Sequence, residues 1–305
     1  MTHISIKFYA EYFALRLAAA FVRRLPRNGV IAFGRAMGRL AMRILPSRYQ
    51  MAKRNMTLAL PDLSVAEIES NVRKNFEHIG ISGVEMLRLD MSNSAHDGIR
   101  QYLDIDGLEH LQEAMALQKG AILLTAHLGF WELGALIPTE LGVPCDIVAK
   151  PMKNPLSDAY FAKVRKAFGA ELLSSRHGAR KILKSIQAKR AVGVLLDQHI
   201  SPPGSIATEF FGRKAYTTTA ITSLAMKYQI PVVPIFCLRK PDNRYDIWVE
   251  PMLLLATDGE HTVETNTQLL VDRIESAIRR DVTQWFWMHK RWRVKPDIKG
   301  QKKSE

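Results

Sequence analysis

The sequence predicts an α/β fold in which a mostly parallel sheet is flanked by helices and preceded by a basic helical extension. From residue 119 onward, short apolar runs alternate with helical stretches, the pattern of βαβ units. Before that point the periodicity is helical. A chain of 305 residues is long enough for one large domain or two small ones. We expect a helical extension over residues 1–60 and an α/β domain over residues 61–305.

The elements follow from local periodicity. Apolar residues recur at helical spacing over 9–22, 30–45, 65–79 and 83–89. Gly34 and Gly38 lie four residues apart, a spacing that favours close packing of two helices. The strands expected are 121–125, 145–149, 170–173, 191–196, 231–238 and 245–249. The helices expected with them are 156–168, 179–189, 218–228 and 263–287, and residues 210–219 are expected to form a loop that leads into a helix.

The positive charge of the chain is concentrated at its two ends. The formal net charge is +13, and the first 60 residues carry eleven Lys or Arg and one acidic residue. The last 17 residues carry seven Lys or Arg and two acidic residues, so the middle is slightly acidic. This distribution predicts an anionic surface as partner. A solvated surface rich in arginine is the alternative.

The charge of the extension lies on apolar helices. Residues 30–45 combine an apolar stripe with an arginine at every fourth position, which is typical of a helix in a membrane interface; a core helix with a solvated face is the alternative. The apolar run at 9–22 is interrupted by Glu11 and Arg16 and is shorter than the roughly 20 residues of a spanning helix. It would span a bilayer only if these two side chains paired or snorkelled. We expect an anionic membrane surface as partner, no nucleic acid and no secretory signal.

Several common sites are missing from the sequence. It contains no GxGxxG, GxxxxGK[ST], HExxH or GxSxG motif, which argues against a dinucleotide enzyme, a P-loop NTPase, a zinc protease and a serine hydrolase. The two cysteines, Cys145 and Cys237, are far apart, which argues against a disulfide framework or a cysteine-based zinc module.

The most informative stretch is TAHLGFWELG at 125–134. His127 follows a buried strand, at the end where open α/β sheets place their ligands. On a continuous helix His127 and Glu132 would diverge by roughly 140°. We therefore expect His127 in the turn before the helix, with Gly129 relaxing the backbone. Glu132 could then hold one ring nitrogen and leave the other as a base. A capping histidine beside an exposed glutamate is the alternative.

Polar residues also follow two other strands. Asp197 is a candidate ligand or positioning residue, and Arg239 is a candidate anion contact. A plain turn and a solvent-facing arginine are the alternatives. The threonines at 217–219 offer hydroxyls and amides for a phosphate, with ordinary helix capping as the alternative.

Seven blocks then occur in an order typical of one family. AHLGFWE at 126–132 is similar to an NHxGNWE block. The other blocks are RNMTL at 54–58, KPMKNP at 150–155, Arg176 before Asp197-Gln198, FFG at 210–212 with Thr218, PVVP at 231–234 with Arg239, and WMHKRW at 287–292. Together they resemble the bacterial lipid A biosynthesis acyltransferases, the lauroyl/myristoyl group of the glycerolipid and lysophospholipid acyltransferase superfamily.

The resemblance implies a glycerolipid acyltransferase-like fold and a reaction. A fatty acyl group would move from a thioester of acyl carrier protein, or of CoA, to a hydroxyl of a phosphorylated glycolipid, a lipid A precursor. His127 would be the general base, oriented by Glu132, with no enzyme nucleophile and no metal or redox cofactor. The location implied is the cytoplasmic face of the bacterial inner membrane. Substrate contacts are implied at Gly129, Trp131, Lys150, Asn154, Arg176, Asp197, Gln198, Phe211, Gly212, Thr218 and Arg239.

The chain departs from the family pattern at Ala126 and Phe130, where the family has Asn. Both flank the expected acceptor site. Another glycolipid or a lysophospholipid is therefore an alternative acceptor. A lipid esterase and a non-catalytic membrane-surface protein are alternative functions.

Overall fold

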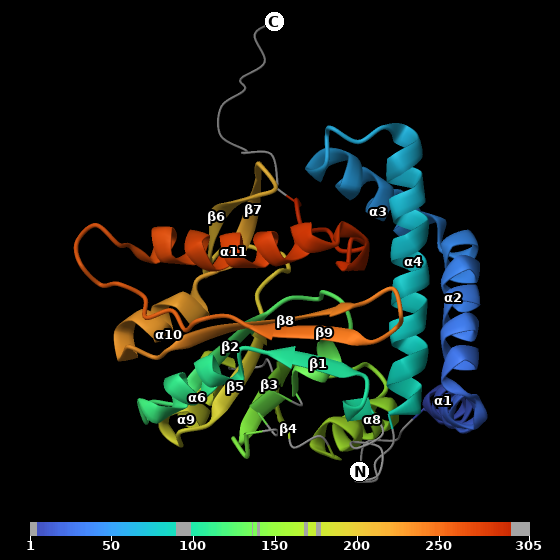
Figure 1. Cartoon of the computed structure of the whole chain (residues 1–305), viewed down its shortest axis with the longest axis horizontal. Coiled ribbons are helices and arrows are strands. Elements are labelled where there is room, and N and C mark those ends of the chain that lie inside the picture. Colours follow the sequence, from blue (N-terminus) through green and yellow to red (C-terminus); the bar gives the residue numbers. More distant parts are fainter. Residues whose placement is uncertain are drawn as a thin grey trace, which may run out of the picture.

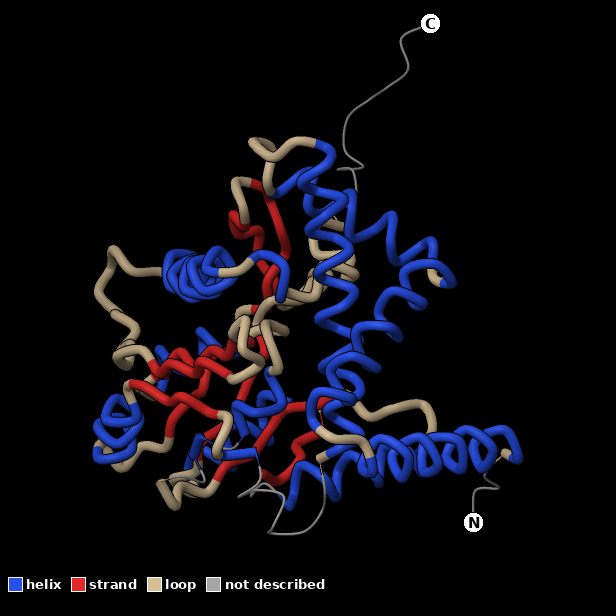
Figure 2. The backbone as a smooth tube through the Cα atoms, turned by 45° about the vertical axis from the view of Figure 1, so that its right-hand side comes forward, coloured by secondary structure: helices blue, strands red, loops and turns tan. Residues whose placement is uncertain are grey.

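A seven-stranded sheet forms the centre of the computed structural model, which describes residues 5–89, 99–135, 137–138, 141–167, 170–174 and 178–293. The strand order is β1-β9-β8-β2-β5-β3-β4, and helices pack against both faces (Figures 1 and 2). The strands are β1 (Leu103–Asp106), β2 (Ala121–Thr125), β3 (Cys145–Ala149), β4 (Ala170–Ser174), β5 (Ala191–Leu195), β8 (Val232–Arg239) and β9 (Tyr245–Val249). All pairings are parallel except that of β8 with β9. The mostly parallel α/β fold expected from the sequence is confirmed.

The strands alternate between two apolar layers, one on each face of the sheet. In β2, Ile122 and Leu124 belong to one layer, whereas Ala121 and Leu123 belong to the other, as the two-residue period of a strand requires. The first layer is covered by α9 (Gly178–Gln187), α10 (Ala220–Tyr228) and α11 (Val263–Arg280), and the second by α6 (Leu108–Ala116) and α8 (Pro155–Ala167). Because both faces of the sheet are buried, the central strands β2, β5 and β8 are almost continuous apolar runs, which made them recognisable in the sequence.

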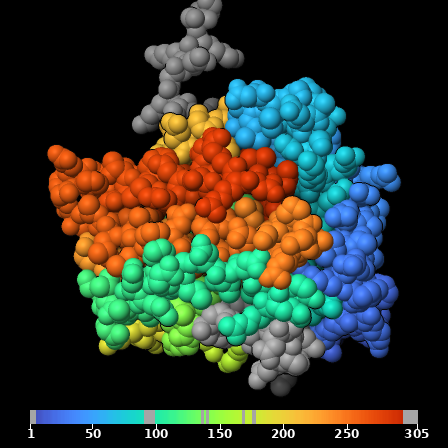
Figure 3. All heavy atoms as spheres, viewed as in Figure 1, coloured from blue at the N-terminus to red at the C-terminus, as the bar shows by residue number. Residues whose placement is uncertain are grey.

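Four N-terminal helices form a layer along one side of the molecule, packed against the C-terminal part of the chain (Figures 1 and 3). They are α1 (Ile6–Arg24), α2 (Arg27–Ile44), α3 (Pro46–Ala59) and α4 (Val65–Arg88). No described helix is both long enough and apolar enough to cross a bilayer.

Glycines allow α2 and α4 to touch along their length. A Cβ atom on Gly38 would lie 2.1 Å from the carbonyl oxygen of Phe76, and one on Gly34 would lie 2.5 Å from the Cα of Ile81. The close packing predicted from Gly34 and Gly38 is therefore confirmed. The prediction of two helices at 65–79 and 83–89 is wrong, because α4 continues through this stretch as one helix with its long face against α2.

Two further sequence predictions are corrected near the C-terminal half. Residues 210–219 form most of a hairpin, β6 (Ser205–Phe210) and β7 (Arg213–Thr218), rather than a loop. Phe211 and Gly212 form its two-residue turn with φ of +53° and +66°, the conformation that matches strand twist. The expected helix 263–287 ends at Arg280, because Asp281 caps a 3₁₀ turn, η2 (Val282–Gln284), and the chain then extends. β1, α3 and α6 (Leu108–Ala116) are not among the individual elements expected from the sequence.

Candidate active site

The candidate base lies where two neighbouring strands end. β2 and β5 pair in parallel, with Thr125 opposite Leu195. His127 lies two residues after Thr125, and Asp197 lies two residues after Leu195. Because neighbouring parallel strands run in the same direction, the residues that follow them lie at the same edge of the sheet, and the two side chains meet there. The His127 Nδ1 atom lies 2.8 Å from Asp197 Oδ1.

Asp197 is buried and accepts three hydrogen bonds. The donors are the Nδ1–H of His127 (2.8 Å), the backbone N–H of His127 (3.0 Å) and the indole N–H of Trp285 (2.7 Å). Burial opposes ionisation of Asp197, but the charge of His127 and these hydrogen bonds lower the pKa of the carboxyl to about 2. Asp197 is thus an anion that orients the imidazole and places the proton on Nδ1.

The Nε2 atom of His127 is the one available for chemistry. The side chain is 23% exposed, and the ring of Trp131 contacts it edge-on with 5.2 Å between centroids. The amide nitrogen of Gln198 lies 3.2 Å from Nε2 and 3.4 Å from Nδ1, so it does not lie along the lone pair of Nε2. Burial opposes protonation of His127, but Asp197 and the charge of Glu132 outweigh this effect and raise the pKa of the imidazole. Such a ring can take a proton from a hydroxyl group and hold it while the reaction proceeds.

Glu132 has a different partner from the one expected. It lies in a 3₁₀ turn, η1 (Trp131–Ala135), and its two oxygens accept from the guanidinium of Arg165 on α8 at 2.7 and 2.8 Å. Among the described residues, no hydrogen bond joins Glu132 to His127. The expectation that Glu132 holds a ring nitrogen is therefore wrong: Asp197 occupies Nδ1, and the fork of Arg165 satisfies both carboxylate oxygens. Glu132 acts on His127 through its charge.

Hydrogen bonds from two parts of the chain, the segment 284–286 and α4, hold the loop that carries His127. The Gly129 N–H donates to the carbonyl of Gln284 at 3.1 Å, and the Phe286 N–H donates to the carbonyl of His127 at 3.0 Å. From α4, the ring of His78 donates to the Gly129 carbonyl at 3.0 Å. Gly129 has a φ of +58°, and a Cβ atom there would lie 1.9 Å from the carbonyl oxygen of Cys237. Only glycine fits at this position.

A family model of bacterial lipid A biosynthesis acyltransferases matches residues 2–294. The chain belongs to this family. A lipid A biosynthesis lauroyltransferase of Escherichia coli K12 is 27% identical over 282 residues, which cover 90% of this chain and 89% of the relative. A lipid A biosynthesis palmitoleoyltransferase of the same organism is 24% identical over 294 residues, covering 95% and 93%. A phosphatidylinositol mannoside acyltransferase of Mycolicibacterium smegmatis is 22% identical over 201 residues, covering 65% and 64%. The protein is an acyltransferase, and the resemblance seen in the sequence is confirmed.

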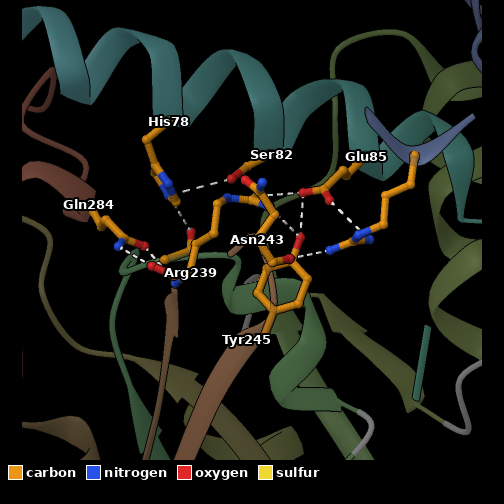
Figure 4. Close-up of polar contacts among 9 residues, drawn as sticks. His78, Ser82, Glu85, Arg239, Asn243, Tyr245 and Gln284 are labelled. Carbon is orange, nitrogen blue, oxygen red and sulfur yellow. Dashed lines mark hydrogen bonds and ion pairs between the residues drawn. The ribbon is translucent and has the colours of Figure 1, made fainter. Parts of the chain in front are cut away.

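Arg239 of this acyltransferase lies in a buried polar cluster (Figure 4). It forms an ion pair with Glu85 of α4 and donates to the hydroxyl of Tyr245 at 2.8 Å. Arg27 adds a second cation 3.6 Å from Glu85. The Arg239 side chain is only 6% exposed, so the predicted substrate contact is wrong. Its guanidinium group pairs with Glu85 and so joins β8 to the N-terminal helices.

Two more predicted substrate contacts are also corrected. Asn154 is buried; its side-chain oxygen accepts from the backbone at the start of α8, and its amide donates to Phe8 and Glu11. Phe211 is buried against Trp287. Neither side chain is accessible to a substrate.

The remaining predicted contacts differ in their position. Gly129, Trp131 and Gln198 lie around His127. Asp197 is buried with both oxygens occupied by His127 and Trp285, so its predicted substrate contact is wrong and it positions the base instead. Lys150 is exposed directly after β3, Gly212 lies at the hairpin turn, and Thr218 accepts from the N–H of Ala220 at the start of α10; their contact with substrate stays a prediction. Arg176 lies outside the described residues.

The structure adds Arg165, Trp285 and Phe286 to the acyltransferase site. The ring of Phe286 lies 6.2 Å from that of His127, centroid to centroid. No local pattern distinguishes Arg165 from other surface-helix arginines. The aromatic run at 285–287 indicates that these residues are not helical. Consecutive helical residues point about 100° apart, so three large aromatic side chains in a row would not share one buried helix face.

Proposed function

We propose that this acyltransferase moves a fatty acyl group from an acyl carrier protein thioester to a hydroxyl group of a lipid A precursor. The observation that carries the proposal is the His127–Asp197 pair, with Nε2 open at the edge of the sheet, in a chain of this family. The names of the relatives, which include lauroyl- and palmitoleoyltransferases of lipid A biosynthesis, support the acceptor.

In the proposed mechanism the acceptor hydroxyl donates a hydrogen bond to Nε2 of His127. As its oxygen attacks the thioester carbonyl, the proton passes to Nε2, and Asp197 stabilises the imidazolium. When the C–S bond breaks, the leaving thiolate takes the proton back from Nε2. The acyl group is then an ester of the acceptor, and no enzyme-bound acyl group forms.

The N-terminal helices support a place on the membrane surface, for which we propose the cytoplasmic face of the inner membrane. In α1, every fourth residue from 9 to 21 is a large apolar side chain, and each is more than half exposed: Tyr9, Phe13, Leu17 and Phe21. An exposed apolar stripe of this kind marks an interaction surface. The net charge of +10 on residues 1–60 would attract anionic lipid headgroups.

The first experiment measures acyl transfer from labelled acyl carrier protein to tetraacylated lipid A precursor and to a lysophospholipid. His127→Ala should abolish transfer, whereas His261→Ala, on an exposed loop, should not. Transfer by His127→Ala at the wild-type rate would refute the base. Transfer to the lysophospholipid alone would refute the proposed acceptor, and release of free fatty acid alone would indicate an esterase.

The second experiment measures flotation with vesicles that contain anionic phospholipid. Phe13→Glu with Leu17→Glu should release the protein from the vesicles. Leu254→Glu removes an equally exposed apolar side chain from a loop outside the N-terminal helices and should not. Equal release in both variants would refute docking through α1.

A further inference from the structure

A polar pocket opens between α3 and the segment that follows η2, and none of its described lining residues is a carboxylate. It has a volume of about 360 Å³. Three cations line it: Arg54 from α3, and Lys290 and Arg293 from the segment that follows α11. Apolar side chains of Met51, Leu58 and Trp292 complete the lining, together with Asn55.

The three cations have no anionic partner among the described residues. All three are exposed. Two cations nearby on the same helical layer have carboxylate partners: Lys53, the neighbour of Arg54, forms a 2.6 Å ion pair with Glu69, and Arg39 forms one of 2.7 Å with Glu77. Clustered cations repel one another, so a cluster without a counter-charge lowers its energy by binding an anion.

The walls of this pocket are fixed by hydrogen bonds. The amide of Asn55 donates to the carbonyls of Trp287 and His289, both at 2.8 Å. The indole N–H of Trp292 donates to the carbonyl of Phe210 at 3.1 Å. Buried Arg291, between Lys290 and Trp292, donates to the carbonyls of Gln198 and Tyr216. The backbones that carry the three cations are therefore held in place before any ligand arrives.

The pocket is close to the proposed base. Phe286 is hydrogen-bonded to the backbone of His127, and Lys290 lies four positions further along the chain. Four extended residues span at most about 14 Å, so the Cα of Lys290 lies within that distance of the Cα of Phe286. Arg291, the neighbour of Lys290, donates to the carbonyl of Gln198, which follows Asp197. The segment that carries Lys290 therefore runs beside the elements that hold His127.

We propose that Arg54, Lys290 and Arg293 form a subsite for a phosphate monoester on the acceptor lipid. Two guanidinium groups and an ammonium group match the charge and the acceptor oxygens of such a group. The apolar wall of Met51, Leu58 and Trp292 suits the less polar face of the sugar that carries it. The subsite rests on the proposed function, in which the acceptor is a phosphorylated glycolipid, and it orients the hydroxyl toward His127.

The test measures binding separately from transfer. Tetraacylated lipid A precursor and its dephosphorylated form, in detergent micelles, are titrated against His127→Ala protein with and without Arg54→Gln and Arg293→Gln. The matched control is Lys119→Gln with Lys227→Gln. These exposed lysines precede β2 and β8, at the edge of the sheet opposite His127, and their removal also costs two charges.

We expect the arginine pair to weaken binding of the phosphorylated lipid at least tenfold and to leave binding of the dephosphorylated lipid unchanged. The lysine pair should change neither affinity. Equal loss for both lipids, no loss for either, or equal affinity of the parent protein for the two lipids would overturn the subsite. Because binding is read in protein that lacks the base, failure of acyl transfer would not mimic any of these results.

Transfer kinetics identify which substrate brings the phosphate. In protein with an intact His127, the arginine pair should raise KM for the phosphorylated acceptor at least tenfold and leave KM for acyl carrier protein unchanged. A rise only in KM for the donor would overturn the assignment to the acceptor, because the prosthetic arm of the carrier also contains a phosphate.

Discussion

Replacing Asp197 by Asn removes the negative charge behind His127 with almost no change of shape. Three N–H groups converge on the Asp197 carboxylate in the structure. An amide has one acceptor oxygen, and its NH2 group would face at least one of these donors. One buried N–H therefore loses its partner, which costs about 1–3 kcal/mol. The other two hydrogen bonds lose their charge assistance, so we expect a fall of roughly 2–4 kcal/mol in the free energy of unfolding.

The effect of Asp197→Asn on catalysis should be larger than its effect on stability. Without the carboxylate, the imidazolium loses its counter-charge and Nδ1–H loses its preferred acceptor. General-base catalysis contributes about 10²–10⁴-fold, so kcat/KM should fall at least about 100-fold. The pKa of His127 is raised chiefly by Asp197, against the effect of burial. The rise of kcat/KM with pH, which follows loss of the His127 proton, should therefore move to lower pH in the variant.

The assay is kcat/KM from pH 5 to 9, with unfolding by denaturant on the same samples. Glu132→Gln is the comparison, because Glu132 affects His127 by charge alone. It should move the pH profile in the same direction by a smaller amount. A folded Asp197→Asn protein with wild-type kcat/KM, or with an unmoved pH profile, would refute the orienting role of Asp197.

Three further substitutions or conditions test the surroundings of the site. Arg165→Met leaves the largely buried Glu132 carboxylate without its two hydrogen bonds, and should cost about 1–3 kcal/mol in denaturant unfolding, whereas Arg165→Lys should restore part of this loss. Gly129→Ala should lower the free energy of unfolding by more than about 3 kcal/mol, since its Cβ meets backbone at 1.9 Å. Burial and the charge of Arg239 lower the pKa of His78 to about 4. Stability should therefore fall by about 3 kcal/mol from pH 6.5 to pH 4, since the unfolded chain binds this proton first, and His78→Gln should flatten this part of the pH profile.

Each of these expectations has a contrary result. Equal unfolding free energies for Arg165→Met and wild type would show that Glu132 is satisfied by other groups. A Gly129→Ala protein of wild-type stability would show that the loop can move away from β8. A pH dependence that is the same in His78→Gln and wild type would assign the acid sensitivity to other groups.

Local periodicity was sufficient for six of the seven strands of the sheet, for most helices and for the position of His127 at a strand end. These features depend on residues close in sequence, because a strand buried on both faces is an apolar run wherever it lies in the sheet. The spacing of Gly34 and Gly38 likewise predicted close packing of their helix against another, because small residues on one helix face leave room for a neighbour; the structure identified that neighbour as α4.

The partners of the charged side chains were decided by the tertiary structure. Spacing along the chain suggested Glu132 for His127, but the pairing of β2 with β5 brings Asp197, seventy residues away, to Nδ1. Likewise, α8 brings Arg165 to Glu132, and α4 brings Glu85 to Arg239, which at the end of a strand looked ready for an anion. A charge is satisfied by whichever opposite charge the fold places within a few ångströms, and sequence separation does not limit that distance.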